Sequence, residues 1–245
     1  MTQVAVDGQI WNYREIGDGI MLKDDNPPLL VLHGWGRSGD EWIQMAKDLG
    51  RKAYVVDLPG FGGSSLPKVK NIFEYSQLVR GFCAYMNLNK VILVGHSLGG
   101  RVGIVLAAEQ IDLVEKLILV DPAGVKPSSL KRSALGTLAK LFAWMPRTWR
   151  QQIVKPMMDV DYRNSPSLRG LYRAVVKDDL RKYLPRIKCK TWVIWGEKDP
   201  ILPLSLTDIY KKLLPYPTAR IIWGAGHDPH LSHYLVLKRI LEEAI

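Results

Sequence analysis

The sequence predicts an α/β fold, in which a mostly parallel, eight-stranded sheet is flanked by helices and carries a helical insertion after the sixth strand. Short apolar runs alternate along the chain with stretches of helical periodicity, a pattern typical of βαβ units. The runs VILV at 91–94 and LILV at 117–120 are apolar at every position, as in strands buried on both faces of a parallel sheet. A long basic segment without strand-like runs follows, which favours an inserted helical region.

The order of the elements follows from these runs. Asp7 and Gly8 separate the first two apolar runs, and this dipeptide favours a tight turn, so we expect an antiparallel hairpin to lead the sheet. Helices separate the later strands, as crossovers between parallel strands require. The expected strands cover residues 3–7, 11–15, 29–32, 53–57, 91–94, 117–120, 191–195 and 220–223. The expected helices cover residues 39–49, 72–87, 98–110, 203–214 and 231–243.

Length and composition exclude several classes of protein. The chain has 245 residues and a mass of 27.7 kDa, with 47% hydrophobic and 24% charged residues. These values exclude a disordered chain, a collagen-like repeat and a small disulfide-stapled protein. Cys83 and Cys189 form no CxxC or zinc-type spacing, which favours a reducing compartment. Because we find neither a signal-peptide pattern nor an apolar run of ~20 residues, we expect a cytoplasmic protein without a transmembrane segment.

The positive charge is concentrated in one part of the chain. The formal net charge is +10, yet residues 122–190 hold sixteen basic and four acidic residues, whereas the rest holds eighteen basic and twenty acidic residues. Such a shift in composition marks an inserted module. We therefore predict a core domain formed by 1–121 and 191–245, and a cap of three or four helices at 122–190. Its apolar residues recur at helical spacing, as at Leu130, Ala134, Leu138, Leu141 and Met145.

The most informative motif is GHSLG at 95–99, which lies between a buried strand and a helical stretch. At such a junction the pattern predicts a nucleophile elbow, a sharp turn that lifts Ser97 above the sheet. Glycine is needed on both sides because a Cβ there would clash in the strained turn. We therefore predict that Ser97 is a nucleophile. A glycine-rich turn without chemistry is the alternative.

A serine nucleophile needs a base, and the base needs an acid that orients it. Asp199 follows the seventh strand and His227 follows the eighth, so both lie at carboxyl ends of strands, where open α/β sheets place their sites. The order Ser97, Asp199, His227 is the one expected on this architecture. Glu197 is an alternative acid, although Asp199 lies further into its loop.

The loop after the third strand, HGWG at 33–36, completes the predicted site. Two backbone N–H groups can stabilise the negative charge that develops on a substrate carbonyl oxygen. We expect the amides of Trp35 and Leu98 to form this oxyanion hole. His33 is expected to brace the loop by hydrogen bonding rather than to take part in the reaction.

Five motifs in this order resemble the α/β-hydrolase superfamily. They are HGWG (33–36), DLPGFGGS (57–64), GHSLGG (95–100), WGEKDPILP (195–203) and GAGH (224–227). The resemblance implies a serine hydrolase with a helical cap after the sixth strand. HGWG and DLPGFGGS are also similar to the carboxylesterases that cleave pimeloyl–acyl-carrier-protein methyl ester. The meta-cleavage hydrolases, which break C–C bonds, share these motifs and remain an alternative.

The predicted function is hydrolysis of a small-molecule ester without a metal or organic cofactor. His227, His230 and His233 are spaced three apart, but His227 is assigned to the triad and we expect no metal site. Among cap residues, Leu138, Leu141, Trp144 and Trp149 are candidates for lining an acyl pocket.

Three other interpretations concern partners. The basic cap could attract an anionic substrate or an acidic carrier protein, or it could simply be solvated. A non-catalytic binding protein with this fold is an alternative, although such a protein would normally lose a triad residue. A pI of about 9.5 is compatible with nucleic-acid binding. The sequence has no nucleic-acid recognition motif, so no nucleic-acid partner is expected.

Overall fold

The computed structural model describes residues 2–17, 26–126 and 166–245. Its centre is an eight-stranded sheet in the order β1-β2-β4-β3-β5-β6-β7-β8. The strands are β1 (Thr2–Val6), β2 (Gln9–Ile16), β3 (Leu29–Leu32), β4 (Ala53–Val56), β5 (Val91–His96), β6 (Val114–Val120), β7 (Lys190–Gly196) and β8 (Pro217–Ile222). The α/β fold predicted from the sequence is therefore confirmed.

The leading hairpin forms as expected, because Asp7 and Gly8 both adopt positive φ, at 49° and 76°. β1 pairs antiparallel with β2, β2 pairs antiparallel with β4, and all later pairs are parallel. The parallel pairing brings the carboxyl ends of β5, β6, β7 and β8 to one edge of the sheet. This edge carries the residues discussed below.

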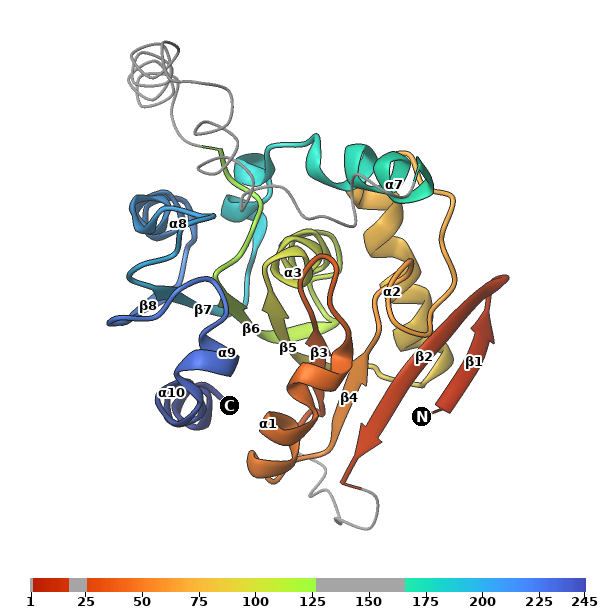
Figure 1. Cartoon of the computed structure of the whole chain (residues 1–245), viewed down its shortest axis with the longest axis horizontal. Helices are drawn as coiled ribbons and strands as arrows, with labels where there is room; N and C mark the ends of the chain where they lie inside the picture. Colours follow the sequence, from red (N-terminus) through yellow and green to blue (C-terminus); the bar gives the residue numbers. More distant parts are fainter. Residues whose placement is uncertain (1, 18–25, 127–165) are drawn as a thin grey trace, which may run out of the picture.

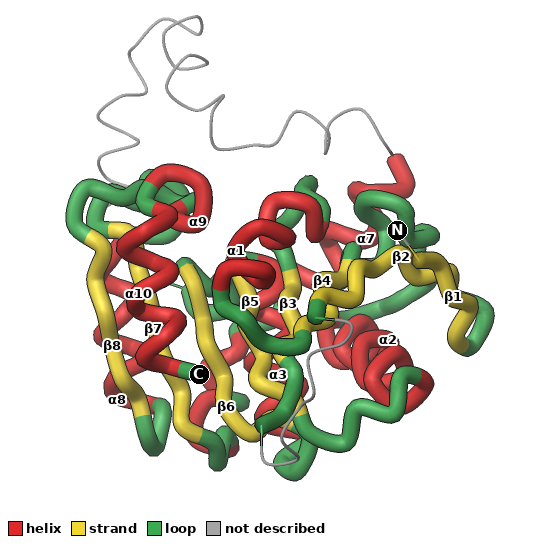
Figure 2. Tube along the Cα trace, turned by 90° about the horizontal axis from the view of Figure 1, so that it is seen from below, coloured by secondary structure: helices red, strands yellow, loops and turns green. Residues whose placement is uncertain are grey.

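Helices cover both faces of the sheet (Figures 1 and 2). One face packs against α2 (Ile72–Tyr85), α3 (Leu98–Glu109) and α8 (Thr207–Leu213), and the other against α1 (Ile43–Asp48) and α10 (Tyr234–Ala244). Successive residues of β5 therefore serve two cores: Val91 and Leu93 lie in one, and Ile92 and Val94 in the other. This explains why the central strands are apolar at every position.

Three expected helices are each split into two elements. Residues 39–49 form the 3-10 turn η1 (Gly39–Trp42) and α1, 203–214 form η6 (Leu204–Leu206) and α8, and 231–243 form α9 (Pro229–Ser232) and α10. The last strand begins at Pro217, earlier than expected. Proline lacks an N–H group but is tolerated at the first residue of an edge strand.

The described part of the basic region lies against the core. α7 (Pro166–Val176) contacts α2, and the 3-10 turns η4 (Leu180–Lys182) and η5 (Leu184–Arg186) contact α3. Leu180, Leu184 and Ile187 are fully buried in the same core as α2 and α3. None of the described helices is long and apolar enough to cross a membrane.

Candidate active site

A sharp strand-to-helix turn holds Ser97. This residue lies between β5 and α3 with φ of 49° and ψ of −107°, a conformation that costs energy for a residue with a Cβ. The flanking glycines make the turn possible. A Cβ on Gly95 would lie 2.6 Å from the backbone of Gly99, and a Cβ on Gly99 would lie 2.1 Å from the carbonyl oxygen of Leu32. The chain can therefore approach itself closely enough to present Ser97 at the carboxyl edge of the sheet.

Ser97, His227 and Asp199 form one hydrogen-bonded chain. The Oγ atom of Ser97 lies 3.1 Å from Nε2 of His227, and Nδ1 of His227 lies 2.7 Å from Oδ2 of Asp199. Because a carboxylate accepts hydrogen bonds, Nδ1 carries the imidazole proton and Nε2 is left to accept the proton of the Ser97 hydroxyl. The arrangement can raise the nucleophilicity of Ser97.

Asp199 is fixed by the backbone of its own loop. Its Oδ1 atom accepts hydrogen bonds from the N–H groups of Ile201 and Leu202, at 2.7 and 2.8 Å, and its side chain is fully buried. Glu197, the other acid in this loop, instead accepts a hydrogen bond from the N–H of Gly224 at 2.9 Å. Of the two acids that the sequence leaves open, Asp199 is the one that contacts the imidazole.

The two amides expected to bind an oxyanion lie on adjoining segments. Leu98 is the first residue of α3, and Trp35 lies in the loop that follows β3. A hydrogen bond of 3.0 Å from the N–H of Gly99 to the carbonyl of His33 joins the two segments. Within the described part of the chain, neither the Trp35 nor the Leu98 amide has an acceptor. An N–H group without a protein acceptor can donate to a bound ligand instead.

His33 braces this loop. The ring is fully buried, and burial lowers its pKa, so it is neutral. Its Nδ1 atom donates to the carbonyl of Gly34 at 2.7 Å, and its Nε2 atom accepts from the N–H of Leu58 at 2.9 Å. Both nitrogens are thus engaged by backbone groups, which leaves His33 no free site for proton transfer.

An aromatic wall extends from the Trp35 side of the site. The ring of Trp35 makes edge contacts with Phe61, at a centroid distance of 4.8 Å, and with Tyr172 on α7, at 5.1 Å. No local signal in the sequence marks Phe61 or Tyr172 as part of the site, because nothing along the chain links α7 to the loop after β3. The predicted pocket residues Leu138, Leu141, Trp144 and Trp149 lie outside the described residues.

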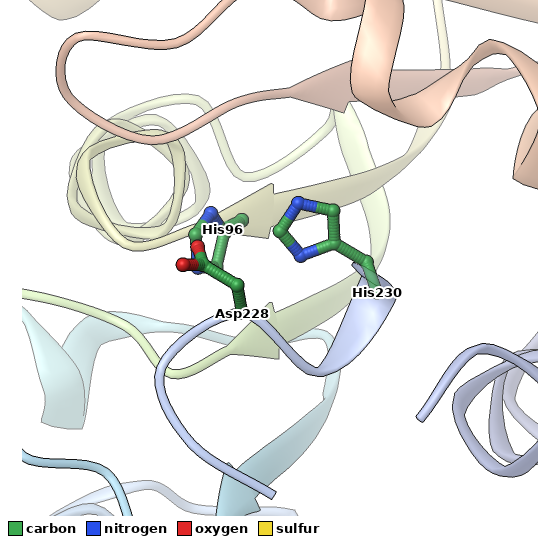
Figure 3. A group of neighbouring side chains, drawn as sticks. All are labelled: His96, Asp228 and His230. Carbon is green, nitrogen blue, oxygen red and sulfur yellow. The ribbon is translucent and has the colours of Figure 1, made fainter. Parts of the chain in front are cut away.

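His96, Asp228 and His230 form a second cluster (Figure 3), and the ring of His96 lies at a centroid distance of 5.1 Å from that of His227. The Nε2 atom of His96 lies 2.9 Å from the carbonyl oxygen of His227. A carbonyl only accepts, so His96 must donate from this nitrogen. Burial is the largest cause of a pKa well below the ordinary histidine value, which keeps the ring neutral. The backbone of His227 is therefore held by a buried neutral histidine.

Ion pairs tie the same cluster to the segment after β3. Arg37 pairs with Asp228 at 2.8 Å and with Glu41 at 2.9 Å, and Glu41 lies 3.2 Å from Nε2 of His230. Sequence reasoning missed Asp228, the acidic residue that lies beside His230. One ligand atom from each member of the cluster lies within 4.8 Å of the others. Nε2 of His96 is occupied by the carbonyl of His227, whereas Nδ1 of His96, Nδ1 of His230 and Oδ1 of Asp228 are buried and have no hydrogen-bond partner among the described residues.

Comparison with known proteins places the chain in a family. A sequence model described as the alpha/beta hydrolase family matches residues 29–237. Monoacylglycerol lipase ABHD6 from Bos taurus is 28% identical over 236 residues, which cover 82% of this chain and 70% of that protein. The pimeloyl-[acyl-carrier protein] methyl ester esterase of Vibrio vulnificus (strain CMCP6) is 26% identical over 231 residues, covering 84% of this chain and 89% of that protein.

The solved structures agree with these relatives in fold. The enol-lactonase from Burkholderia xenovorans LB400 superposes with a TM-score of 0.77 at 20% identity, covering 99% of this chain and 98% of that one. The family match includes Ser97, Asp199 and His227 and most of the remaining chain. This chain therefore belongs to the alpha/beta hydrolase family.

Proposed function

We propose that this protein hydrolyses carboxylic esters through a Ser97–His227–Asp199 triad and an acyl-enzyme intermediate. The observation that carries the proposal is the continuous chain of contacts from Ser97 Oγ through His227 to Asp199, at 3.1 and 2.7 Å. The coarser assignment, an ester hydrolase, is supported by relatives that are named as esterases and lipases. No step of this reaction requires a metal or cofactor.

In the first half of the reaction, Ser97 attacks the ester carbonyl while His227 takes the hydroxyl proton on Nε2. Asp199 accepts the hydrogen bond from Nδ1, which fixes the tautomer of His227 and stabilises the imidazolium that forms. His227 then donates the proton to the departing alcohol, and the acyl group remains on the Oγ atom of Ser97. In the second half, His227 takes a proton from the water that attacks the acyl carbon and returns it to Oγ of Ser97 as the bond between the acyl carbon and Oγ breaks, which releases the carboxylic acid.

The amides of Trp35 and Leu98 stabilise the tetrahedral intermediates of both halves. Negative charge develops on the former carbonyl oxygen, and preorganised N–H donors lower the energy of that charge. The hydrogen bond from Gly99 to His33 supports this assignment because it couples the two segments that carry the donors. Such donors typically contribute about 2.7–4 kcal/mol each to transition-state stabilisation.

The aromatic wall of Trp35, Phe61 and Tyr172 favours esters with an apolar acyl group. Aromatic side chains provide apolar area close to the oxyanion donors. We further propose that the basic region at 122–190 steers anionic substrates or an acidic carrier protein toward the site, because its excess of twelve positive charges exceeds what the rest of the chain can neutralise. A methyl ester on an acyl-carrier protein, as in the name of the Vibrio relative, combines both features.

The test is to label and inactivate the proposed nucleophile. Wild-type protein should react with a fluorophosphonate probe and hydrolyse p-nitrophenyl esters, whereas Ser97→Ala should lose labelling and about 10⁶-fold in kcat. Ser205→Ala, an exposed serine on η6, serves as the matched control and should retain both. Near wild-type esterase activity in Ser97→Ala would overturn the proposal.

A further inference from the structure

We propose that Asp121 is a positioning residue for the triad, with a carboxyl group that keeps its proton at neutral pH and donates it to the carboxylate of Asp199. The inference rests on the proposed function, since it assigns Asp199 to the triad. It adds a second acid, from the end of a different strand, that no sequence motif marks.

The backbone places Asp121 at this position with some strain. Asp121 directly follows β6 and adopts a φ of 41°, in the left-handed region, where residues other than glycine are uncommon. Its N–H donates to the carbonyl of Ile194 at 2.9 Å, and its Oδ1 atom accepts from the N–H of Gly196 at 2.8 Å. Both bonds attach Asp121 to β7, directly before the loop that carries Asp199.

The two carboxyl groups share one buried location. One oxygen of Asp121, one oxygen of Asp199 and a ring nitrogen of His227 all lie within 4.8 Å of one another. The Asp121 residue is fully buried, and so is the side chain of Asp199. Two carboxylates this close, away from water, repel each other strongly, so the pair retains a proton.

The hydrogen bonds decide which acid carries that proton. Asp199 accepts from three N–H groups, those of Ile201, Leu202 and the His227 ring, and such bonds stabilise a carboxylate. Asp121 accepts only from Gly196, and its Oδ2 atom has no hydrogen-bond partner among the described residues. A proton on Oδ2 satisfies that atom and supplies a donor to Asp199.

Electrostatics supports the same assignment. Burial raises the pKa of Asp121 to about 9; the N–H of Gly196 opposes this shift, and the negative charge of Asp199 adds to it. The titratable groups near Asp121 among the described residues are Asp199, His227 and, with a smaller effect, Asp228. At neutral pH the pair therefore carries one negative charge, on the acid that contacts His227.

Carbon-13 NMR tests the protonation state directly. In protein labelled at the aspartate carboxyl carbons, one resonance should titrate with a midpoint near 9, and Asp121→Asn should remove it. The N–H signal of Gly196, which donates to Asp121, should shift with the same midpoint in the wild-type protein, so the test survives if the variant fails to fold. Titration of every aspartate below about pH 6 would overturn the proposal.

Stability gives an independent measure with a defined sign. The folded-state pKa of Asp121, about 9, lies above the unfolded value, so its stabilising contribution is present below about pH 4 and is lost as the pH rises toward 9. The Tm of the wild-type protein should therefore fall relative to that of Asp121→Asn across this range. Glu197→Gln is the control, because Glu197 lies on the same loop as Asp199 but accepts its hydrogen bond from Gly224. The Tm of the wild-type protein should not fall relative to that of Glu197→Gln over this pH range. A difference in Tm between the wild-type protein and Asp121→Asn that does not change with pH would contradict the proposal.

Kinetics tests whether the proton matters to the triad. The side-chain amide introduced by Asp121→Asn can still accept from Gly196 and donate to Asp199, so at pH 7 this conservative variant should retain more of the wild-type kcat/KM than Asp121→Ala, which removes both groups. Above pH 9 the wild-type value should fall about tenfold per pH unit as the two carboxylates repel each other, whereas that of Asp121→Asn should not. If kcat/KM depends on pH in the same way in the wild-type protein and in Asp121→Asn, Asp121 has a structural role only. Failure of Ser97 labelling would instead refute the proposed function, while the NMR result would still decide the state of Asp121.

Discussion

Replacing Gly99 with alanine tests how the nucleophile turn depends on close backbone contact. A Cβ at this position would lie 2.1 Å from the carbonyl oxygen of Leu32 and 2.5 Å from its carbonyl carbon. Ordinary van der Waals contact begins at 3.4 Å, so α3 and β3 must separate by about 1.3 Å to accept the methyl group. Leu32 is a backbone neighbour in a central strand, which leaves little freedom to relax by side-chain rotation.

The expected cost combines strain and a weakened hydrogen bond. Overpacking a well-packed interior typically costs about 1–3 kcal/mol, and the 3.0 Å hydrogen bond from Gly99 to His33 contributes about 1 kcal/mol that the separation would remove. We expect Gly99→Ala to lower the free energy of unfolding by about 3 kcal/mol, and hence the Tm by about 6–12 °C. Because the same separation moves Leu98 relative to Trp35, kcat should fall about 10²-fold.

Calorimetry, urea denaturation and p-nitrophenyl ester hydrolysis measure these effects. Gly170→Ala is the matched control: Gly170 lies within α7, and a Cβ there meets no atom within 4 Å. The same substitution should stabilise that helix by about 0.5–1 kcal/mol, with no effect on kcat. If the free energy of unfolding of Gly99→Ala lies within about 0.5 kcal/mol of the wild-type value and its kcat is unchanged, the turn is not constrained as described.

Three further predictions concern the acid that contacts His227, the contact of Arg101 with the end of α7, and the basic region. Asp199→Asn should lower kcat about 10⁴-fold by favouring the wrong His227 tautomer, whereas Glu197→Gln should remain within about threefold of the wild-type value; equal losses would contradict the assignment of the acid. Arg101, buried in α3, donates to the carbonyls of Val175 and Asp178. Arg101→Met should therefore lower the free energy of unfolding, measured by urea denaturation, by about 3 kcal/mol. Arg186 is exposed and pairs with Glu109, so the control Arg186→Met should lower it by less than about 1 kcal/mol. The kcat/KM for an anionic ester should fall between ~20 mM and ~500 mM salt while that for a neutral ester of equal length stays flat; equal responses would show that the basic region does not steer substrates.

The sequence by itself determined the fold class and singled out the residues of the candidate site. Eight apolar runs, the Asp7-Gly8 turn and the alternation with helices reflect local constraints of burial and backbone geometry. The GHSLG motif is similarly local, because the strain at Ser97 and the close approaches at Gly95 and Gly99 arise within a few residues of one strand-to-helix turn. Such features can be read along the chain. The strand order, in which β4 lies between β2 and β3, follows from no local signal.

Only the tertiary structure decided how the residues around the proposed triad are connected. Asp199 rather than Glu197 contacts His227, and His96 holds the carbonyl of a residue 131 positions away. Asp121, which reads in the sequence as an ordinary residue after a strand, lies beside Asp199 in a buried location. These contacts join loops at the ends of different parallel strands, and their distances depend on strand register and loop conformation. The pKa of each acid and histidine in turn depends on burial and neighbouring charge, which exist only once the strand ends have been brought together.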